Sequence, residues 1–181
     1  MMEQKVTFGN LAKYGVLLGL VLIILSLIKI YVGNFIEQDI KELIFMLLKA
    51  AAYVFFIYSA IRFAIKHFYA TNYSFAKGVK VGLFLGLIAA VFTCVYQYIE
   101  MKFIIPDVYQ AQIELAIEEM LEKGVPEEMG ATVRSMFSIS AIVSALVGTF
   151  LVSLLASLFI APFFKKQQII NIEEASSSDN Q

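Results

Sequence analysis

Long apolar runs separated by short charged segments dominate the pattern along the chain. Four of these runs are near the roughly 20 residues that an α-helix needs to cross a hydrocarbon core of about 30 Å. They cover residues 14–32, 43–65, 78–105 and 136–164. The pattern predicts an all-α, polytopic integral membrane protein with four transmembrane helices.

The longest polar interruption falls between the third and fourth runs, over residues 106–135. Apolar residues recur there at helical spacing as far as Leu121. Gly124 and then Pro126 give a helix stop followed by a new helix start. We therefore expect a helical hairpin whose second helix continues into the fourth span. The tail, residues 167–181, has low hydrophobicity and no periodicity, so we expect it to be disordered.

Composition supports the bilayer as the solvent, because 60% of the residues are hydrophobic and only 16% are charged. A single cysteine, Cys94, and a single histidine, His67, exclude an internal disulfide and a metal site built from several Cys or His ligands. No nucleophile–base pair, carboxylate pair or metal centre follows from the spacing of the residues. We therefore expect a protein that is not an enzyme, with no catalytic residues, no metal, no cofactor and no nucleic-acid partner.

Basic residues are unevenly divided between the two sides that four spans would create. The side shared by both termini and the second loop carries eight Lys and Arg, against five on the opposite side, while Lys49 lies within a span. Basic residues near span ends favour the cytoplasmic side. The sequence thus predicts a multi-pass protein of the cell (inner) membrane, with both termini in the cytoplasm and the hairpin outside it.

Small residues recur every fourth position along three of the spans. Helices in lipid associate through close backbone approach at such residues. The expected helix-packing residues are Gly15, Gly19, Gly78, Gly82, Gly86, Ser144 and Gly148. We expect the third and fourth spans to pack against each other. The Gly15–Gly19 pair is the better candidate for a contact with a second copy of the chain.

Two charged residues lie within the spans, Lys49 in the second and Glu100 near the end of the third. Both can extend to the headgroups. Alternatively they form an intramembrane ion pair, which would mark a polar cavity facing outward.

Three glutamates stand four apart on one face of the predicted hairpin, Glu114, Glu118 and Glu122. A solvated acidic face is the simpler interpretation. The alternative is a face that contacts a basic partner or divalent cations, although one exposed helix makes a poor cage for Ca²⁺.

Further local features carry a resemblance to a known family. An aromatic-glycine segment enters the third span (YSFAKG, residues 73–78), and Tyr98 is followed by Ile105-Pro106-Asp107 and a helix rich in Glu and Met. With the four apolar spans, these features resemble the DUF4199 family, short bacterial integral membrane proteins of unknown function, over about residues 8–166. The resemblance implies the same architecture and no activity or site.

Two functions are consistent with this sequence. We favour a non-enzymatic scaffold or interaction protein that uses the acidic hairpin, with the lipid bilayer and a membrane-protein partner as its contacts. The alternative is a small transporter or channel, which would work as a homo-oligomer because four helices alone line little pore.

Overall fold

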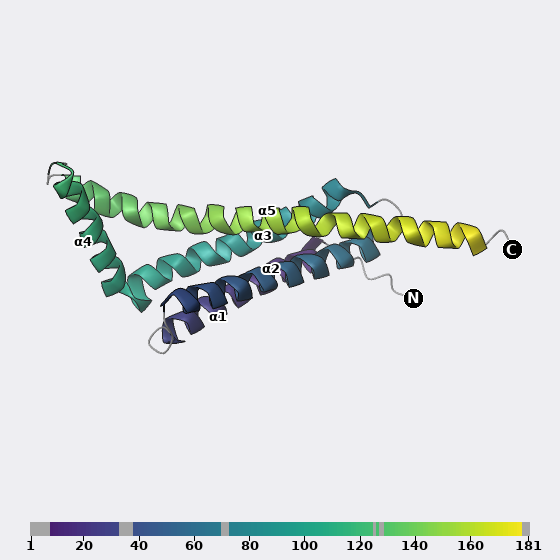
Figure 1. Ribbon diagram of the computed structural model, residues 1–181, viewed down its shortest axis with the longest axis horizontal. Coiled ribbons are helices and arrows are strands. Elements are labelled where there is room, and N and C mark those ends of the chain that lie inside the picture. Colours follow the sequence, from purple (N-terminus) through teal and green to yellow (C-terminus); the bar gives the residue numbers. More distant parts are fainter. Residues whose placement is uncertain (1–7, 33–37, 70–72, 125, 127–128, 179–181) are drawn as a thin grey trace.

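The computed structural model describes residues 8–32, 38–69, 73–124, 126 and 129–178. These residues form five α-helices and one short π-helical segment, with no strand among them (Figure 1). The elements in chain order are α1 (Phe8–Val32), α2 (Gln38–Phe68), α3 (Phe75–Ile99), η1 (Glu100–Ile104), α4 (Pro106–Glu122) and α5 (Gly130–Ser178). The predicted all-α class is confirmed.

Four of these helical stretches are long and apolar enough to cross a membrane, as the sequence predicted. They are Gly9–Val32, Gln38–Phe68, Phe75–Ile104 and Thr132–Phe164. Each is longer than the predicted run, chiefly because the helix begins three to five residues before the apolar run does. The architecture is compatible with a multi-pass membrane protein.

The four long helices form an antiparallel bundle in which α3 packs against both α5 and α1. The beginning of α1 and the end of α5 lie at one end of the bundle, and α4 lies at the other (Figure 1). The interior is filled by Leu18, Ile57, Ile61 and Leu85, all fully buried. Many large apolar side chains remain exposed on the outside, as expected for helices whose outer faces contact lipid.

Helices α3 and α5 approach each other closely at small residues. A Cβ atom added to Gly82 would lie 2.3 Å from the Cβ of Ser157, and one added to Gly86 would lie 2.4 Å from the Cβ of Ser153. A Cβ added to Gly78 would lie 2.8 Å from the Cβ of Ala161. These contacts bring the two backbones together through the stripes that the sequence analysis identified.

Gly15 and Gly19 pack against another helix of the same chain. A Cβ added to Gly15 would lie 2.9 Å from the Cβ of Ile88, and one added to Gly19 would lie 2.8 Å from the Cβ of Phe92. Both glycines therefore face α3. The face that we considered the better candidate for a dimer contact is covered by the chain's own third span.

The chain changes direction sharply between α3 and α4. The α-helix passes into η1 and ends at Ile105, whose φ of −135° and ψ of 53° are not helical. Pro106 then occupies the start of α4, where its missing N–H costs nothing. Helices α3 and α5 diverge toward this end of the bundle, and α4 spans the gap between them (Figure 1).

The expected stop at the end of α4 coincides with Gly124, which has a φ of +82°. Glycine adopts this left-handed conformation without the steric cost that a Cβ imposes. Helix α5 begins at Gly130 and runs without interruption into the fourth span. The placement of this region outside the cytoplasm stays a prediction.

At the other end, α5 continues to Ser178, through most of the tail that we expected to be disordered. Its final segment contains no glycine and no proline after Pro162, so nothing in the sequence stops the helix there. The predicted boundary at residue 166 stays a prediction.

Candidate functional site

The four candidate spans line an open cavity of about 540 Å³ between them. Side chains from α1, α2, α3 and α5 line it, in the half of the bundle nearer α4, where α3 and α5 diverge (Figure 1). Small-molecule sites in proteins typically measure about 300–1,000 Å³. The central cavity is therefore large enough for a ligand.

Hydroxyl groups gather on the wall formed by α3 and α5. The Oγ1 atoms of Thr93 and Thr149 lie 3.1 Å apart and share a hydrogen bond. Thr93 also donates to the carbonyl of Ala90, at 3.0 Å, so the shared proton comes from Thr149. The Tyr53 hydroxyl of α2 interacts with the Thr149 side chain as well. One cluster of hydroxyls thus joins three helices.

The hydroxyl of Tyr96 is buried and has no hydrogen-bond partner among the described residues. Its charged neighbour is the Glu100 carboxylate, one helical turn further along. This carboxylate interacts with the Tyr96 hydroxyl and can accept its proton. A ligand or a water molecule in the cavity would compete with Glu100 for that role.

Lys49 is a half-buried cation on the cavity wall. No carboxylate of the described residues lies within 4.0 Å of its ammonium group, so the predicted direct ion pair with Glu100 is not formed. The two charges interact at longer range. The close pair at this end of the bundle joins Lys29 and Glu42, with nitrogen and oxygen 2.6 Å apart.

The positions of these residues along α1 and α2 explain why Lys29, and not Lys49, forms the close ion pair. Lys29 lies in the last turn of α1 and Glu42 in the first turns of α2, so the connection between the helices brings them together at the exposed rim. Lys49 lies about two turns deeper on α2.

Ser144 and Gly148 also line the central cavity. We expected both to pack against the third span. A Cβ added to Gly148 would meet nothing within 4 Å, unlike those added to Gly82 and Gly86. Gly148 therefore faces the cavity, although α3 and α5 still touch on either side of it, where Thr93 meets Thr149 and the Cys94 thiol lies 3.6 Å from the carbonyl of Ile142.

Several cavity residues were missed by sequence reasoning, namely Tyr53, Thr93, Tyr96, Gln97 and Thr149. Thr93, Tyr96 and Gln97 stand at i, i+3 and i+4, so they share one face of α3. Three polar side chains on one face of an apolar span were a signal that could have found this wall.

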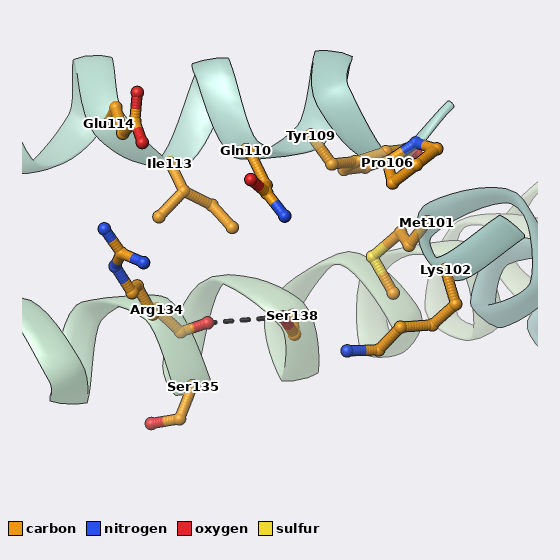
Figure 2. A pocket seen from close by; sticks show the side chains of 10 residues that line it. All are labelled: Met101, Lys102, Pro106, Tyr109, Gln110, Ile113, Glu114, Arg134, Ser135 and Ser138. Carbon is orange, nitrogen blue, oxygen red and sulfur yellow. Dashed lines mark hydrogen bonds between the residues drawn. The ribbon is translucent and has the colours of Figure 1, made fainter. Parts of the chain in front are cut away.

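A second hollow of about 480 Å³ lies between η1, α4 and the first turns of α5. Figure 2 shows Lys102 and Arg134 at opposite ends of this cleft, with Gln110 projecting into it from α4. The side-chain amide of Gln97 donates a hydrogen bond to the Tyr109 hydroxyl. Since Gln97 lines the central cavity and Tyr109 lines the cleft, this bond lies in the wall between them.

The predicted partner-facing glutamates, Glu114, Glu118 and Glu122, are all exposed on α4. Glu114 lines the cleft and lies across from Arg134 in Figure 2. No group of three or more Asp, Glu, His or Cys residues that could hold a metal occurs within the described part of the chain. The expectation of a protein without metal, cofactor or catalytic residues stays a prediction.

Comparison with known proteins identifies the family of this chain but does not indicate an activity. No curated protein and no solved structure matches the chain. Residues 13–166 match the model of the family described as "Protein of unknown function (DUF4199)". The match covers the first candidate span from residue 13, the other three spans in full, the central cavity and the cleft. It also agrees with the resemblance seen in the sequence around residues 73–78 and Pro106. The chain belongs to the DUF4199 family.

Proposed function

We propose that this chain is a non-enzymatic membrane protein that binds a small polar or amphipathic molecule in the central cavity, as a small transporter does. The observation that carries the proposal is Lys49, which lines a cavity between all four spans with no carboxylate of the described residues at ion-pairing distance. Ionisable residues inside a membrane are costly, and they mark functional sites.

The lining of the cavity defines the class of ligand. An anionic group of the ligand would contact Lys49, and the Tyr96 hydroxyl and the Gln97 amide would supply hydrogen bonds. A separate apolar groove of about 290 Å³ adjoins the cavity and shares Ile23 and Tyr96 with it. An amphipathic molecule could place its polar group in the cavity and its apolar part in the groove.

Packing at the other end of the bundle supports access from one side at a time. Leu18, Ile57 and Leu85 are fully buried there, and Gly82 lies directly against Ser157. A bundle that is closed at one end and hollow at the other has the form of one state of an alternating-access cycle. Four helices alone line little pore, so we expect transport to require an oligomer.

Cysteine accessibility tests whether water enters the cavity. In a Cys94→Ala background, Ser144→Cys places a thiol on the cavity wall, and Val143→Cys places one on the neighbouring position, which is 51% exposed outside the cavity. In sealed vesicles, a charged, membrane-impermeant thiol reagent should modify Ser144→Cys from one side only. Val143→Cys should not react, because lipid covers it. No reaction at Ser144→Cys from either side would refute an open polar cavity.

Ligand binding itself is tested by mass spectrometry of the purified chain in lipid nanodiscs. We expect a small molecule to remain bound to the wild type and to Lys80→Met, which changes an exposed lysine far from the cavity. Lys49→Met should lose it. Equal retention by Lys49→Met, or no bound molecule in the wild type, would count against the proposal.

A second candidate function is contact with a partner through α4, the hypothesis that we favoured from the sequence. It is supported by the absence of any buried residue along α4 and by Leu115, which is 61% exposed between Glu114 and Glu118. An apolar side chain among acidic ones would suit a basic, amphipathic segment of another membrane protein.

Photo-crosslinking from α4 discriminates this candidate from the first. A photoreactive amino acid in place of Leu115 should capture one reproducible partner in the native membrane. The same group in place of Ile117, which faces α5, should not capture it. Replacing Glu114, Glu118 and Glu122 with glutamine should abolish capture at position 115. No adduct at that position would refute the partner-binding role and leave the cavity proposal standing.

A further inference from the structure

The cleft between η1, α4 and α5 gathers cationic and hydrogen-bonding groups from three elements at one end of the bundle (Figure 2). Its volume of about 480 Å³ is separate from the central cavity. Lys102 comes from η1, Gln110 from α4 and Arg134 from the second turn of α5. Lys102 and Arg134 are 32 positions apart in the sequence, so the fold is what brings them to one cleft.

Lys102 and Arg134 have no counter-charge close by within the described part of the chain. No carboxylate there lies within 4.0 Å of either cation. Glu114 is the acidic residue that lines the cleft, and Figure 2 shows it on α4, across from Arg134. The lining therefore carries two cations and one carboxylate, and neither cation is held in an ion pair within the described part of the chain.

Neutral donors lie between the two cations. Gln110 projects into the cleft, and Tyr109 lies beside it on α4 (Figure 2). The Tyr109 hydroxyl accepts a hydrogen bond from Gln97, which leaves its own proton available for donation. Burial raises the pKa of Tyr109, and the nearby charge of Glu100 acts in the same direction, so the hydroxyl stays protonated at neutral pH.

The position of the cleft relative to the candidate spans indicates the kind of anion. Lys102 lies two residues before the end of the candidate span Phe75–Ile104, and Arg134 is the third residue of the candidate span Thr132–Phe164. Both cations therefore lie near the ends of their spans, where a helix leaves the hydrocarbon core. Phe103 and Met136, 75% and 64% exposed, follow them and offer apolar surface to lipid chains.

We propose that this cleft binds the phosphate of an anionic phospholipid headgroup, with Lys102 and Arg134 as its cationic contacts and Gln110 and Tyr109 as hydrogen-bond donors. A free phosphate shares the same chemistry. The lipid is the favoured source because the cleft is wider than one phosphate requires and because apolar surface adjoins both cations. The site would hold α4 against the surface of the bilayer.

Lipid binding to the full-length chain tests this proposal. The purified protein in detergent is titrated with phosphatidylglycerol or with phosphatidylcholine of the same acyl chains, and bound lipid is counted by native mass spectrometry. We expect tighter binding of phosphatidylglycerol. A basic residue near a membrane surface contributes enough for roughly a fivefold loss of affinity on removal. Lys102→Gln and Arg134→Gln should each weaken the binding of phosphatidylglycerol by about that factor.

Three further measurements make the outcome specific. Lys123→Gln removes an exposed lysine at the end of α4, outside the cleft, and should leave lipid binding unchanged. Lys102→Arg keeps the charge and should restore binding, which separates loss of the cation from loss of folding. Competition with millimolar inorganic phosphate should not displace the lipid.

The results that would overturn the proposal are equally distinct. Equal affinity for the two lipids would refute an anion site in the cleft. Unchanged phosphatidylglycerol binding by a variant carrying both Lys102→Gln and Arg134→Gln would also refute it. Displacement of the lipid by inorganic phosphate would refute the headgroup as the source of the anion. Because Lys49 lies outside the cleft, Lys49→Met should leave this lipid binding intact. Failure of the lipid proposal can therefore be distinguished from failure of the cavity proposal.

Discussion

Gly86→Ala should weaken the contact between α3 and α5, although it adds only one methyl group. The added Cβ would lie 2.4 Å from the Cβ of Ser153 and 2.6 Å from its Oγ. Non-bonded carbons normally approach to about 3.5–4.0 Å. Ser153 is fully buried, and its Cβ is fixed to the backbone of α5. The helices must therefore separate locally by about 1 Å to accept the methyl group.

Opposing effects set the size of this destabilisation. Overpacking of a close-packed contact typically costs about 1–3 kcal/mol. Replacing glycine by alanine in a helix returns roughly 0.5–1 kcal/mol, because alanine loses less conformational entropy on folding. We expect a net loss of about 1–2 kcal/mol in the free energy of unfolding. Gly82→Ala, whose Cβ would lie 2.3 Å from that of Ser157, should behave in the same way.

Gly148→Ala is the matched control on the facing helix, α5. Its Cβ would meet nothing within 4 Å, so only the favourable helix term applies, and stability should be unchanged or higher by up to about 1 kcal/mol. The assay is unfolding by sodium dodecyl sulfate in mixed micelles, followed by circular dichroism. A second measurement adds Ser153→Gly to Gly86→Ala, which removes the opposing Cβ. The pair should show a favourable coupling of about 0.5–3 kcal/mol.

Equal stability of Gly86→Ala and Gly148→Ala would refute the close approach of α3 and α5. The absence of coupling between positions 86 and 153 would refute the specific contact, even if Gly86→Ala were destabilising for another reason.

Three further predictions follow from the same structure. Tyr73→Phe removes the hydrogen bond that the Tyr73 hydroxyl donates to the carbonyl of Ala161 at 3.0 Å, and should lower the free energy of unfolding by about 1 kcal/mol in the same micelle assay. Burial raises the pKa of Tyr73 to about 12, so the folded state favours the neutral hydroxyl. The contribution of Tyr73 should be complete below the ordinary tyrosine pKa of about 10 and be lost as the pH rises from 10 to 12, a decline that Tyr73→Phe should lack. Lys29→Met and Glu42→Gln should each cost little, with a coupling of about 0.2–1 kcal/mol in a double-mutant cycle, because the pair is partly exposed. A reporter enzyme that is active only outside the cytoplasm should be active when fused at residue 124 and inactive at the C-terminus; the reverse would overturn the predicted orientation.

The four spans could be predicted from the sequence because their signal is local and repeated. Each apolar run is long enough to cross a bilayer, and the structure contains a helix at each of them. The stop at Gly124 could be predicted for the same reason, since its φ of +82° suits glycine. The continuation of α5 to Ser178 could not be predicted from hydrophobic periodicity, because a helix on a polar segment produces none.

The candidate site could be predicted only in part. Lys49 could be identified from the sequence, because a charge inside an apolar run is costly. Thr93, Thr149 and Tyr53 are ordinary residues in isolation, and only the packing of three helices makes them one cluster. No local feature of the sequence predicts that α3 and α5 diverge. For that reason Ser144 and Gly148 were assigned to a packing stripe and instead line the cavity.

The divergence of α3 and α5 connects the two hollows. Where the helices touch, Gly82 and Gly86 meet serines of α5, and there is no room for a ligand. Toward α4 the same two helices separate, which opens the central cavity between the spans and the cleft between α4 and α5. The hydrogen bond from Gln97 to Tyr109 lies in the wall between these hollows. Movement of α4 would break this bond and open the wall. A lipid headgroup held by Lys102 and Arg134 would oppose that movement, because it fixes α4 against the ends of α3 and α5.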